Sequence, residues 1–171
     1  PDLGNRVSFA GGYVKEPQVG MHNWVASFDL NSLYPNIIVQ WNMSPETILN
    51  EITPNIHPNR ILEHGVEPPG DYCLSGNGVR FTNTHRGIIP SLIVEYYAER
   101  AEIKKKMLKA KQDIEKADKT DKQGVYKIER DIARFENQQM AIKIMMNSLY
   151  GALGNQYFKY FDLRMAEAIT L

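Results

Sequence analysis

The side chain best suited to metal chemistry is a single carboxylate, Asp29. An apolar run over residues 25–28 ends at this acid, and a polar turn and Leu33-Tyr34-Pro35 follow it. The pattern predicts a strand over residues 24–28 that breaks into a turn and a short helix over residues 36–40. An acid at a strand end is held rigidly enough to bind a metal ion. The alternative is that Asp29 only caps the following helix.

A second set of polar side chains lies near the end of a predicted helix. Lys143, Asn147, Tyr150 and Gly151 are spaced at i, i+4, i+7 and i+8, which places them on one helix face. The lysine and the amide could bind phosphate oxygens. A tyrosine beside a glycine leaves a flat surface on which a base could stack. The alternative is an ordinary polar helix face that stops at a glycine.

The preceding predicted helix carries a matching pair, Arg100 and Lys104, also four residues apart. In an antiparallel helical hairpin these cations could face Lys143 and Asn147. Four converging donors would bind a triphosphate. Their neighbours Lys105 and Lys106 point elsewhere and are expected to be solvated.

Two long amphipathic segments are required to position these groups. Apolar residues recur at three- and four-residue steps from Leu92 to Lys116 and from about Val125 to Leu149, with a polar break at residues 119–124. This predicts an antiparallel helical hairpin with a charged far end. Gly87-Ile88-Ile89-Pro90-Ser91 opens its first helix.

The remaining elements are short. Tyr72-Cys73-Leu74 and Val79-Arg80-Phe81 flank a Gly/Asn turn and predict a β-hairpin. Ser44-Pro45-Glu46 predicts a helix start or a turn. Residues 50–71 contain four prolines and are expected to be irregular. Asp162 is expected to cap a last helix over Leu163–Leu171.

Composition and charge set outer limits. The 43% hydrophobic and 23% charged fractions are typical of a globular domain rather than a disordered one. No window approaches ~18 uninterrupted apolar residues, so no transmembrane helix or membrane partner is expected. The zero net charge hides five basic and ten acidic side chains in residues 1–99, against twelve and seven in residues 100–134. The basic middle could hold a polyanion, or it could be the solvated surface of a helical hairpin.

Two stretches carry a family resemblance. Asp29-Leu30-Asn31-Ser32-Leu33-Tyr34-Pro35 closely resembles the first polymerase motif of family B DNA polymerases, commonly D-x-x-S-L-Y-P. The run from Lys143 to Gly151 resembles their second motif, K-x-x-x-N-S-x-Y-G. Gly87-Ile88-Ile89-Pro90 resembles the run leading into their fingers. Four further segments look most like the T-even-type phage branch: Lys15-Glu16-Pro17, Ser44-Pro45-Glu46-Thr47, Asn147–Asn155 and Tyr160–Arg164.

The resemblance implies an α+β fold. It consists of a partial polymerase palm, made of short strands and a hairpin, with an inserted long two-helix fingers arm. The implied regions are 1–86 for the partial palm, 87–155 for the fingers and 156–171 for a truncated return to the palm. The implied activity is addition of a dNTP to a primer 3′-hydroxyl on template DNA, in the cytoplasm of a phage-infected host cell. Because the chain starts at Pro1 and stops within a helix, we expect a piece of a longer protein.

The first motif implies these roles. Asp29 resembles the catalytic carboxylate that bridges two Mg²⁺ ions, and the Leu30 carbonyl resembles a backbone metal ligand. Ser32 and Leu33 match positions whose amides hold the triphosphate. Tyr34 matches the ring that packs under the deoxyribose and excludes a 2′-hydroxyl.

The fingers imply further roles. The residues matching those that bind the triphosphate are Arg100, Lys104, Lys143 and Asn147. Lys143 is also a plausible proton donor to the leaving pyrophosphate. Tyr150 and Gly151 match the surface against the nascent base pair.

The family's third motif, a Tyr-Gly-Asp-Thr-Asp-Ser-like turn with the other metal-binding acid, is absent, and no exonuclease or thumb is recognisable. Asp162 is a helix cap rather than a substitute. Two metal ions need more negative charge than one carboxylate supplies, so the isolated chain is expected to be inactive. Two alternatives remain: one subunit of a split polymerase completed by a separate chain, or a non-catalytic module that binds nucleotide or nucleic acid.

Overall fold

The computed structural model describes residues 12–66 and 70–171, which contain five α-helices and one three-stranded antiparallel sheet. The predicted α+β class is confirmed. The parts of the predicted regions that fall on residues 1–11 and 67–69 lie outside the described residues. No helix in the described ranges is both long enough and apolar enough to cross a membrane.

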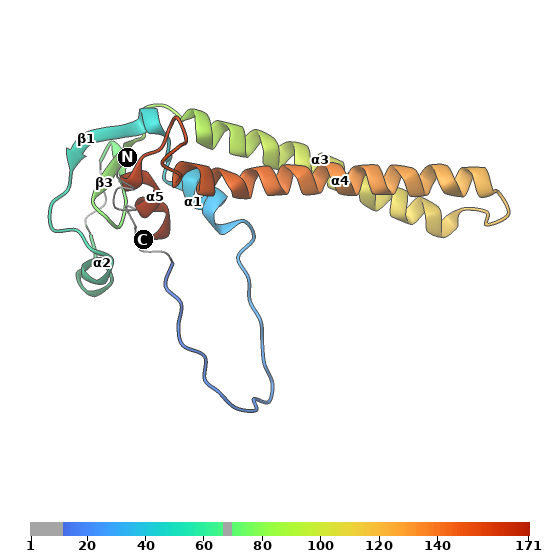
Figure 1. The fold of residues 1–171 in the computed structure, drawn as a ribbon, viewed down its shortest axis with the longest axis horizontal. Helices are drawn as coiled ribbons and strands as arrows, with labels where there is room; N and C mark the ends of the chain where they lie inside the picture. Colours follow the sequence, from blue (N-terminus) through green and yellow to red (C-terminus); the bar gives the residue numbers. More distant parts are fainter. Residues whose placement is uncertain (1–11, 67–69) are drawn as a thin grey trace, which may run out of the picture.

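Two long helices dominate the molecule, α3 (Ile88–Lys116) and α4 (Lys122–Leu153). They pack side by side as an antiparallel hairpin that projects far beyond the rest of the fold (Figure 1). Ile93, Met107, Ile142 and Met146 are buried. The predicted helical hairpin is therefore confirmed.

The second helix runs further than predicted. It continues through the exposed Gly151 to Leu153, rather than ending near Leu149. A glycine inside a helix costs about 1 kcal/mol relative to alanine. Leu153 is fully buried in the core, and burying a leucine contributes roughly 1.5–3 kcal/mol. Packing therefore outweighs the local preference for a helix end at the glycine.

The sheet has the order β1-β3-β2, with β1 (Ile48–Ile52), β2 (Tyr72–Leu74) and β3 (Val79–Thr82). The predicted hairpin of β2 and β3 is confirmed, with Cys73 opposite Phe81. Gly78 in its turn has φ +83°, and a Cβ there would lie 2.5 Å from the Thr53 carbonyl oxygen. This turn therefore requires glycine.

Two elements occupy the region predicted to be irregular. Strand β1 is defined by its pairing with β3, where Ile48 lies opposite Phe81, and that partner is more than thirty residues away in the sequence. Helix α2 (Pro58–His64) begins at Pro58, after His57, whose Nδ1 accepts from the Asn59 N–H at 3.3 Å. Proline is favoured at the first position of a helix. Pro58 therefore starts a helix, whereas the sequence analysis predicted that it breaks regular structure.

One core lies where the base of the arm meets the body. It packs α1 (Leu33–Gln40) and α5 (Leu163–Thr170) against β3, α3 and α4. The fully or almost fully buried apolar side chains include Ile38, Met43, Phe81, Ile93, Met146, Leu153, Met165 and Ile169. The predicted helix after Pro35 is confirmed, beginning three residues earlier than expected.

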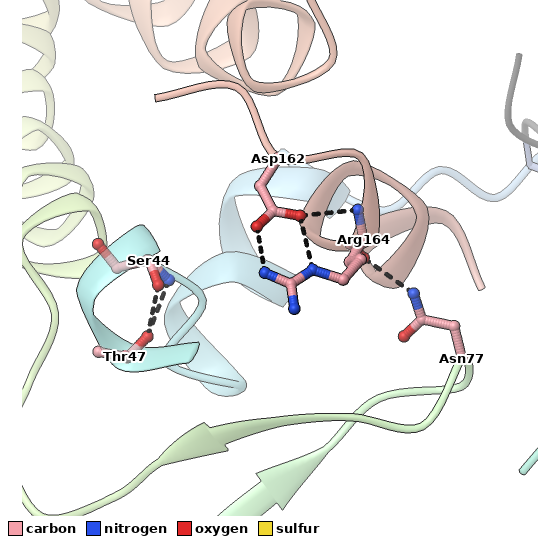
Figure 2. A network of polar contacts seen from close by, with 5 residues as sticks. All are labelled: Ser44, Thr47, Asn77, Asp162 and Arg164. Carbon is pink, nitrogen blue, oxygen red and sulfur yellow. Dashed lines mark hydrogen bonds and ion pairs between the residues drawn. The ribbon is translucent and has the colours of Figure 1, made fainter. Parts of the chain in front are cut away.

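Helix α5 is held by polar contacts at its start. Asp162 caps it by accepting from the Arg164 N–H at 2.9 Å, and it pairs with the Arg164 guanidinium at 2.7 Å (Figure 2). The hydrogen bond from Arg164 lowers the pKa of Asp162. Asn77, in the β-hairpin turn, donates to the Arg164 carbonyl at 2.8 Å. The predicted capping role of Asp162 is confirmed.

The first turn of α3 finds its hydrogen-bond partners in the segment after α1. Asn42 Oδ1 accepts from the Gly87 N–H at 2.8 Å, and Glu46 Oε1 accepts from the Ile88 N–H at 2.6 Å. Ser44 and Thr47 form a capping box in the 3₁₀ helix η1 (Pro45–Thr47), so the predicted helix start at this site is confirmed (Figure 2). A segment distant in sequence thus caps the arm.

The predicted strand over residues 24–28 is wrong. These residues belong to an extended loop that reaches away from the body (Figure 1), with Val25 77% and Phe28 94% exposed. A strand needs a neighbouring strand to pair its backbone. In the described part of the chain this segment has none, so its apolar pattern is not enough to form a strand.

Candidate active site

Asp29 lies on the extended loop, close to the start of α1. Its side chain is exposed, and it makes no hydrogen bond or ion pair with any described residue. Leu30 is 69% exposed. Because no strand precedes it, Asp29 lacks the rigid support that the sequence predicted.

The turn that follows is well defined. Ser32 adopts the left-handed conformation (φ 52°, ψ 51°) as the N-cap of α1, and its carbonyl accepts from the Asn36 N–H at 3.1 Å. Asn36 Nδ2 donates to the Asn31 carbonyl at 2.9 Å. The N–H groups of Leu33 and Tyr34, in the first helical turn, have no acceptor within the helix. Such groups at a helix N-terminus favour an anion.

The two motif regions meet through a pair of aromatic rings. Tyr34 and Tyr150 lie 116 residues apart in the sequence, yet their rings stack with centroids 4.4 Å apart and planes 23° from parallel. Desolvation raises the pKa of Tyr150, and the proximity of Tyr34 adds to the shift. The fold therefore brings the end of the arm against the turn that follows Asp29.

The predicted phosphate-binding residues occupy successive turns of the two helices of the arm. Arg100 Nε donates to Gln139 Oε1 at 3.2 Å, so these two positions of α3 and α4 lie at the same level of the arm. Lys143 lies four residues beyond Gln139 toward the body, and Lys104 lies four residues beyond Arg100 toward the tip. Each step is about 6 Å along a helix. Lys104 and Lys143 therefore lie on either side of the Arg100–Gln139 pair.

Asn147 lies a further helical turn toward the body. The four predicted donors therefore span about 18 Å along the arm, from Lys104 to Asn147. Lys104, Lys143 and Asn147 are exposed, and Arg100 is half-buried. Along the arm these residues therefore form a row, and the convergence of their side chains on one group stays a prediction.

Three residues near the site were not predicted from the sequence. Gln139 is buried and fixes Arg100, and its position four residues before Lys143 was the available signal. Asn36 holds the turn before α1 and also reaches the Tyr97 hydroxyl on α3 at 3.5 Å. Nothing in the sequence marks that contact, because 61 residues separate the two side chains.

The described residues do not form a complete metal site. No group of three or more His, Cys, Asp or Glu side chains in the described ranges is arranged to hold a metal ion. Asp29 and the Leu30 carbonyl would together supply two oxygen ligands, whereas Mg²⁺ needs six in near-octahedral geometry. The donor set in this chain therefore does not fit a pair of magnesium ions without further ligands.

A groove of about 300 Å³ lies elsewhere on the arm. It is lined by Lys106, Lys109, Ala110, Asp113, Ile128, Asp131 and Phe135. Lys106 is two residues from Lys104, so the two side chains point about 200° apart around the helix. The groove thus lies on another side of the arm, and none of its residues belongs to the predicted site.

The chain is similar to known proteins over almost all of its length. A family model described as DNA polymerase family B matches residues 2–171. The chain is 33% identical to the DNA-directed DNA polymerase of Enterobacteria phage T4, over 100% of this chain and 23% of the phage protein. It is 34% identical to that of Escherichia phage RB69, over 95% of this chain and 22% of the phage protein.

An archaeal relative is equally similar. DNA polymerase 1 of Pyrococcus abyssi is 34% identical over 96% of this chain and 17% of the archaeal protein. The chain thus spans about a fifth of the length of the curated relatives that it matches. The resemblance to T-even-type phage polymerases is confirmed by the likeness to the T4 and RB69 proteins. On the family match over almost all of its length, the chain belongs to DNA polymerase family B.

Proposed function

We propose that this chain forms part of the palm and the whole fingers of a template-directed DNA polymerase, which adds a dNTP to a primer 3′-hydroxyl. The observation that carries the proposal is the stack of Tyr34 on Tyr150 at 4.4 Å. It places the first and second motif regions of a family B chain side by side. The regions of the proposal are 1–86 for the palm part, 87–155 for the fingers and 156–171 for the return to the palm.

The triphosphate would bind between the start of α1 and the arm. The backbone N–H groups of Ser32 and Leu33 would donate to its oxygens, as expected at a helix N-terminus. The row of donors on the arm would hold the same group by charge-assisted hydrogen bonds: Arg100, Lys104, Lys143 and Asn147. Lys143 would give a proton to the leaving pyrophosphate, which neutralises charge that develops in the transition state.

The aromatic pair would hold the sugar and the base. Tyr34 would pack under the deoxyribose, where a ribose 2′-hydroxyl would clash with its ring. Tyr150 and Gly151 would face the nascent base pair. A Cβ at Gly151 would have no neighbour within 4 Å, so the helix leaves open space at this position.

Magnesium would be held only in part by this chain. Asp29 and the Leu30 carbonyl would contribute ligands to a site that acidic residues outside the chain complete. When bound, divalent metal ions would stabilise the attacking and leaving oxygens. Primer–template DNA, dNTP and the rest of the polymerase, in cis or as a separate chain, are the proposed partners, in the cytoplasm of an infected host cell.

The test is nucleotide affinity. Lys143→Ala removes one cation from the proposed row, and charge-assisted hydrogen bonds contribute about 1.5–3 kcal/mol. We therefore expect the Kd for dNTP to rise roughly 10- to 150-fold. Calorimetric titration of the chain with a dNTP, together with DNA binding by anisotropy, measures both properties.

Lys106→Ala is the matched control. Lys106 is also an exposed lysine on the arm, but it lines the groove away from the row. We expect Lys106→Ala to leave the Kd for dNTP unchanged and both variants to bind DNA nearly as wild type does. An unchanged Kd for dNTP in Lys143→Ala would refute the proposed role of the row.

A further inference from the structure

The turn between Asp29 and α1 needs support from outside the backbone. Ser32 is not a glycine, yet it has φ +52°, a conformation that costs a side-chain-bearing residue about 1–2 kcal/mol. Its side chain makes no capping hydrogen bond. The main side-chain contact that fixes the turn is the Asn36 amide, which donates to the Asn31 carbonyl at 2.9 Å.

The same amide also reaches the arm. Asn36 Nδ2 lies 3.5 Å from the Tyr97 hydroxyl on α3, a long hydrogen bond between segments 61 residues apart. Tyr97 is one helical turn from Arg100, which is itself fixed by Gln139. One side chain therefore contacts both the turn that offers Ser32 and Leu33 and the helix that offers Arg100.

Packing alone does not explain this asparagine. Asn36 is exposed, whereas its neighbours Pro35 and Ile38 are buried in the core. The Tyr97 ring is half-buried against the core. Its hydroxyl oxygen is the atom that accepts from the Asn36 amide. The contact can thus be removed by deleting a single oxygen atom.

We propose that Asn36 and Tyr97 form a positioning pair, which, together with the packing of α1 on the arm, sets the distance between the Ser32 turn and the row of donors. This inference rests on the proposed function and names two positioning residues that the two motifs do not include. Without the pair, the turn and the arm each keep their groups but hold them at a less defined separation. The nucleotide then has to order the groups of the turn and the arm when it binds, which lowers the affinity for dNTP.

Tyr97→Phe is the sharpest test, because it deletes only the hydroxyl. A hydrogen bond contributes about 0.5–1.5 kcal/mol, and this one is long and exposed, so we expect the Kd for dNTP to rise about twofold. Tyr96→Phe is the matched control: Tyr96 is the adjacent half-buried tyrosine, and its hydroxyl bonds to no described residue. Its Kd for dNTP should equal that of the wild type.

A double-mutant cycle separates a linked pair from two independent effects. Asn36→Ala should raise the Kd more than Tyr97→Phe does, because it also frees the turn. Adding Tyr97→Phe to Asn36→Ala should cause no further rise, since the partner is already gone. Asn36→Gln should recover little of the affinity, because the longer side chain misplaces the amide.

A second readout does not depend on nucleotide. The Asn36 N–H, which bonds to the Ser32 carbonyl, should exchange with solvent faster in Tyr97→Phe than in wild type or Tyr96→Phe. A wild-type Kd and wild-type exchange in Tyr97→Phe, or additive effects in the cycle, would overturn the pair while leaving the proposed function intact. If the wild-type chain binds no dNTP, the proposed function is refuted. Faster exchange of the Asn36 N–H in Tyr97→Phe would then still show that Asn36 and Tyr97 are physically linked.

Discussion

Gly87 precedes α3 and Gly151 lies near the end of α4, so both glycines are at the base of the helical hairpin. Their surroundings differ. A Cβ at Gly87 would lie 2.6 Å from the Ser44 Cβ and 3.0 Å from a Thr47 methyl group, both of which are buried. A Cβ at Gly151 would meet nothing within 4 Å. The first glycine is thus required by close packing, whereas the second leaves space on the surface.

We expect Gly87→Ala to destabilise the chain by about 1–3 kcal/mol, the usual effect of forcing an extra carbon into a packed site. Gly151→Ala should instead raise the free energy of unfolding by about 0.5–1 kcal/mol, because alanine is the better helix former. Urea unfolding followed by circular dichroism measures both. Equal stability of the two variants would contradict the packing argument.

The same pair of variants separates stability from binding. The added methyl group at Gly151 would occupy the surface beside Tyr150, where the nascent base pair is proposed to lie. We therefore expect the Gly151→Ala chain to be more stable but to bind dNTP and primer–template DNA together less tightly than wild type does.

At the level of elements, the start of α3 depends on a cap from another segment. Desolvation raises the pKa of the Glu46 carboxyl, but hydrogen bonds from the Ile88 N–H and the Ser44 hydroxyl outweigh it. The pKa of Glu46 is therefore lowered from 4.5. Because the folded-state pKa is the lower one, this stabilisation is complete above about pH 4.5 and is lost as the pH falls through the folded value.

Glu46→Gln should remove that dependence. An amide keeps an acceptor for the Ile88 N–H but cannot ionise, so the variant should lose less stability than wild type between pH 5 and pH 3. Thermal unfolding of both chains across this range gives the comparison. Parallel curves would show that Glu46 does not contribute to acid sensitivity.

The arm itself was predictable because its information is local. Apolar steps of three and four residues predicted both helices. Helix α4 nevertheless starts at Lys122, before the predicted start near Val125, because Asp121 caps it by accepting from the Gly124 N–H at 3.0 Å. The β2–β3 hairpin was predictable for the same reason, since a short Gly/Asn turn joins its strands. The strand β1 was not, because its partner is supplied by a distant segment.

At the level of the whole molecule, the chain covers 17–23% of the length of its relatives. It holds one exposed acid near the first motif and no cluster of metal-binding side chains in the described ranges. The loop before Asp29 also exposes apolar side chains, among them Trp24 and Phe28, which are 102% and 94% exposed. An exposed apolar surface of this kind favours contact with another protein surface, which supports the proposed association with the rest of a polymerase.

We therefore expect this chain alone not to extend a primer in the presence of Mg²⁺ and dNTPs, because two metal ions cannot be held by a single carboxylate. Primer extension on a gel measures this directly. Primer extension by a purified preparation of this chain that contains no contaminating nuclease or polymerase would refute the expectation. Recovery of activity on adding a separate polypeptide that carries the missing acids would favour the split enzyme, and activity only in one continuous chain would favour the single enzyme.

The sequence by itself determined the family, the two motifs and the helical hairpin. These depend on residue identity and on spacings of a few residues, which are independent of the tertiary contacts. It also predicted that the chain holds only one of the acids that the proposed metal site needs.

Only the tertiary structure decided how the groups meet. The stack of Tyr34 on Tyr150, the link from Asn36 to Tyr97 and the row fixed by Arg100 and Gln139 join segments 39 to 116 residues apart. The failed strand before Asp29 has the same cause. Strands and contacts between distant side chains need a partner elsewhere in space, and local spacing carries no information about where that partner lies.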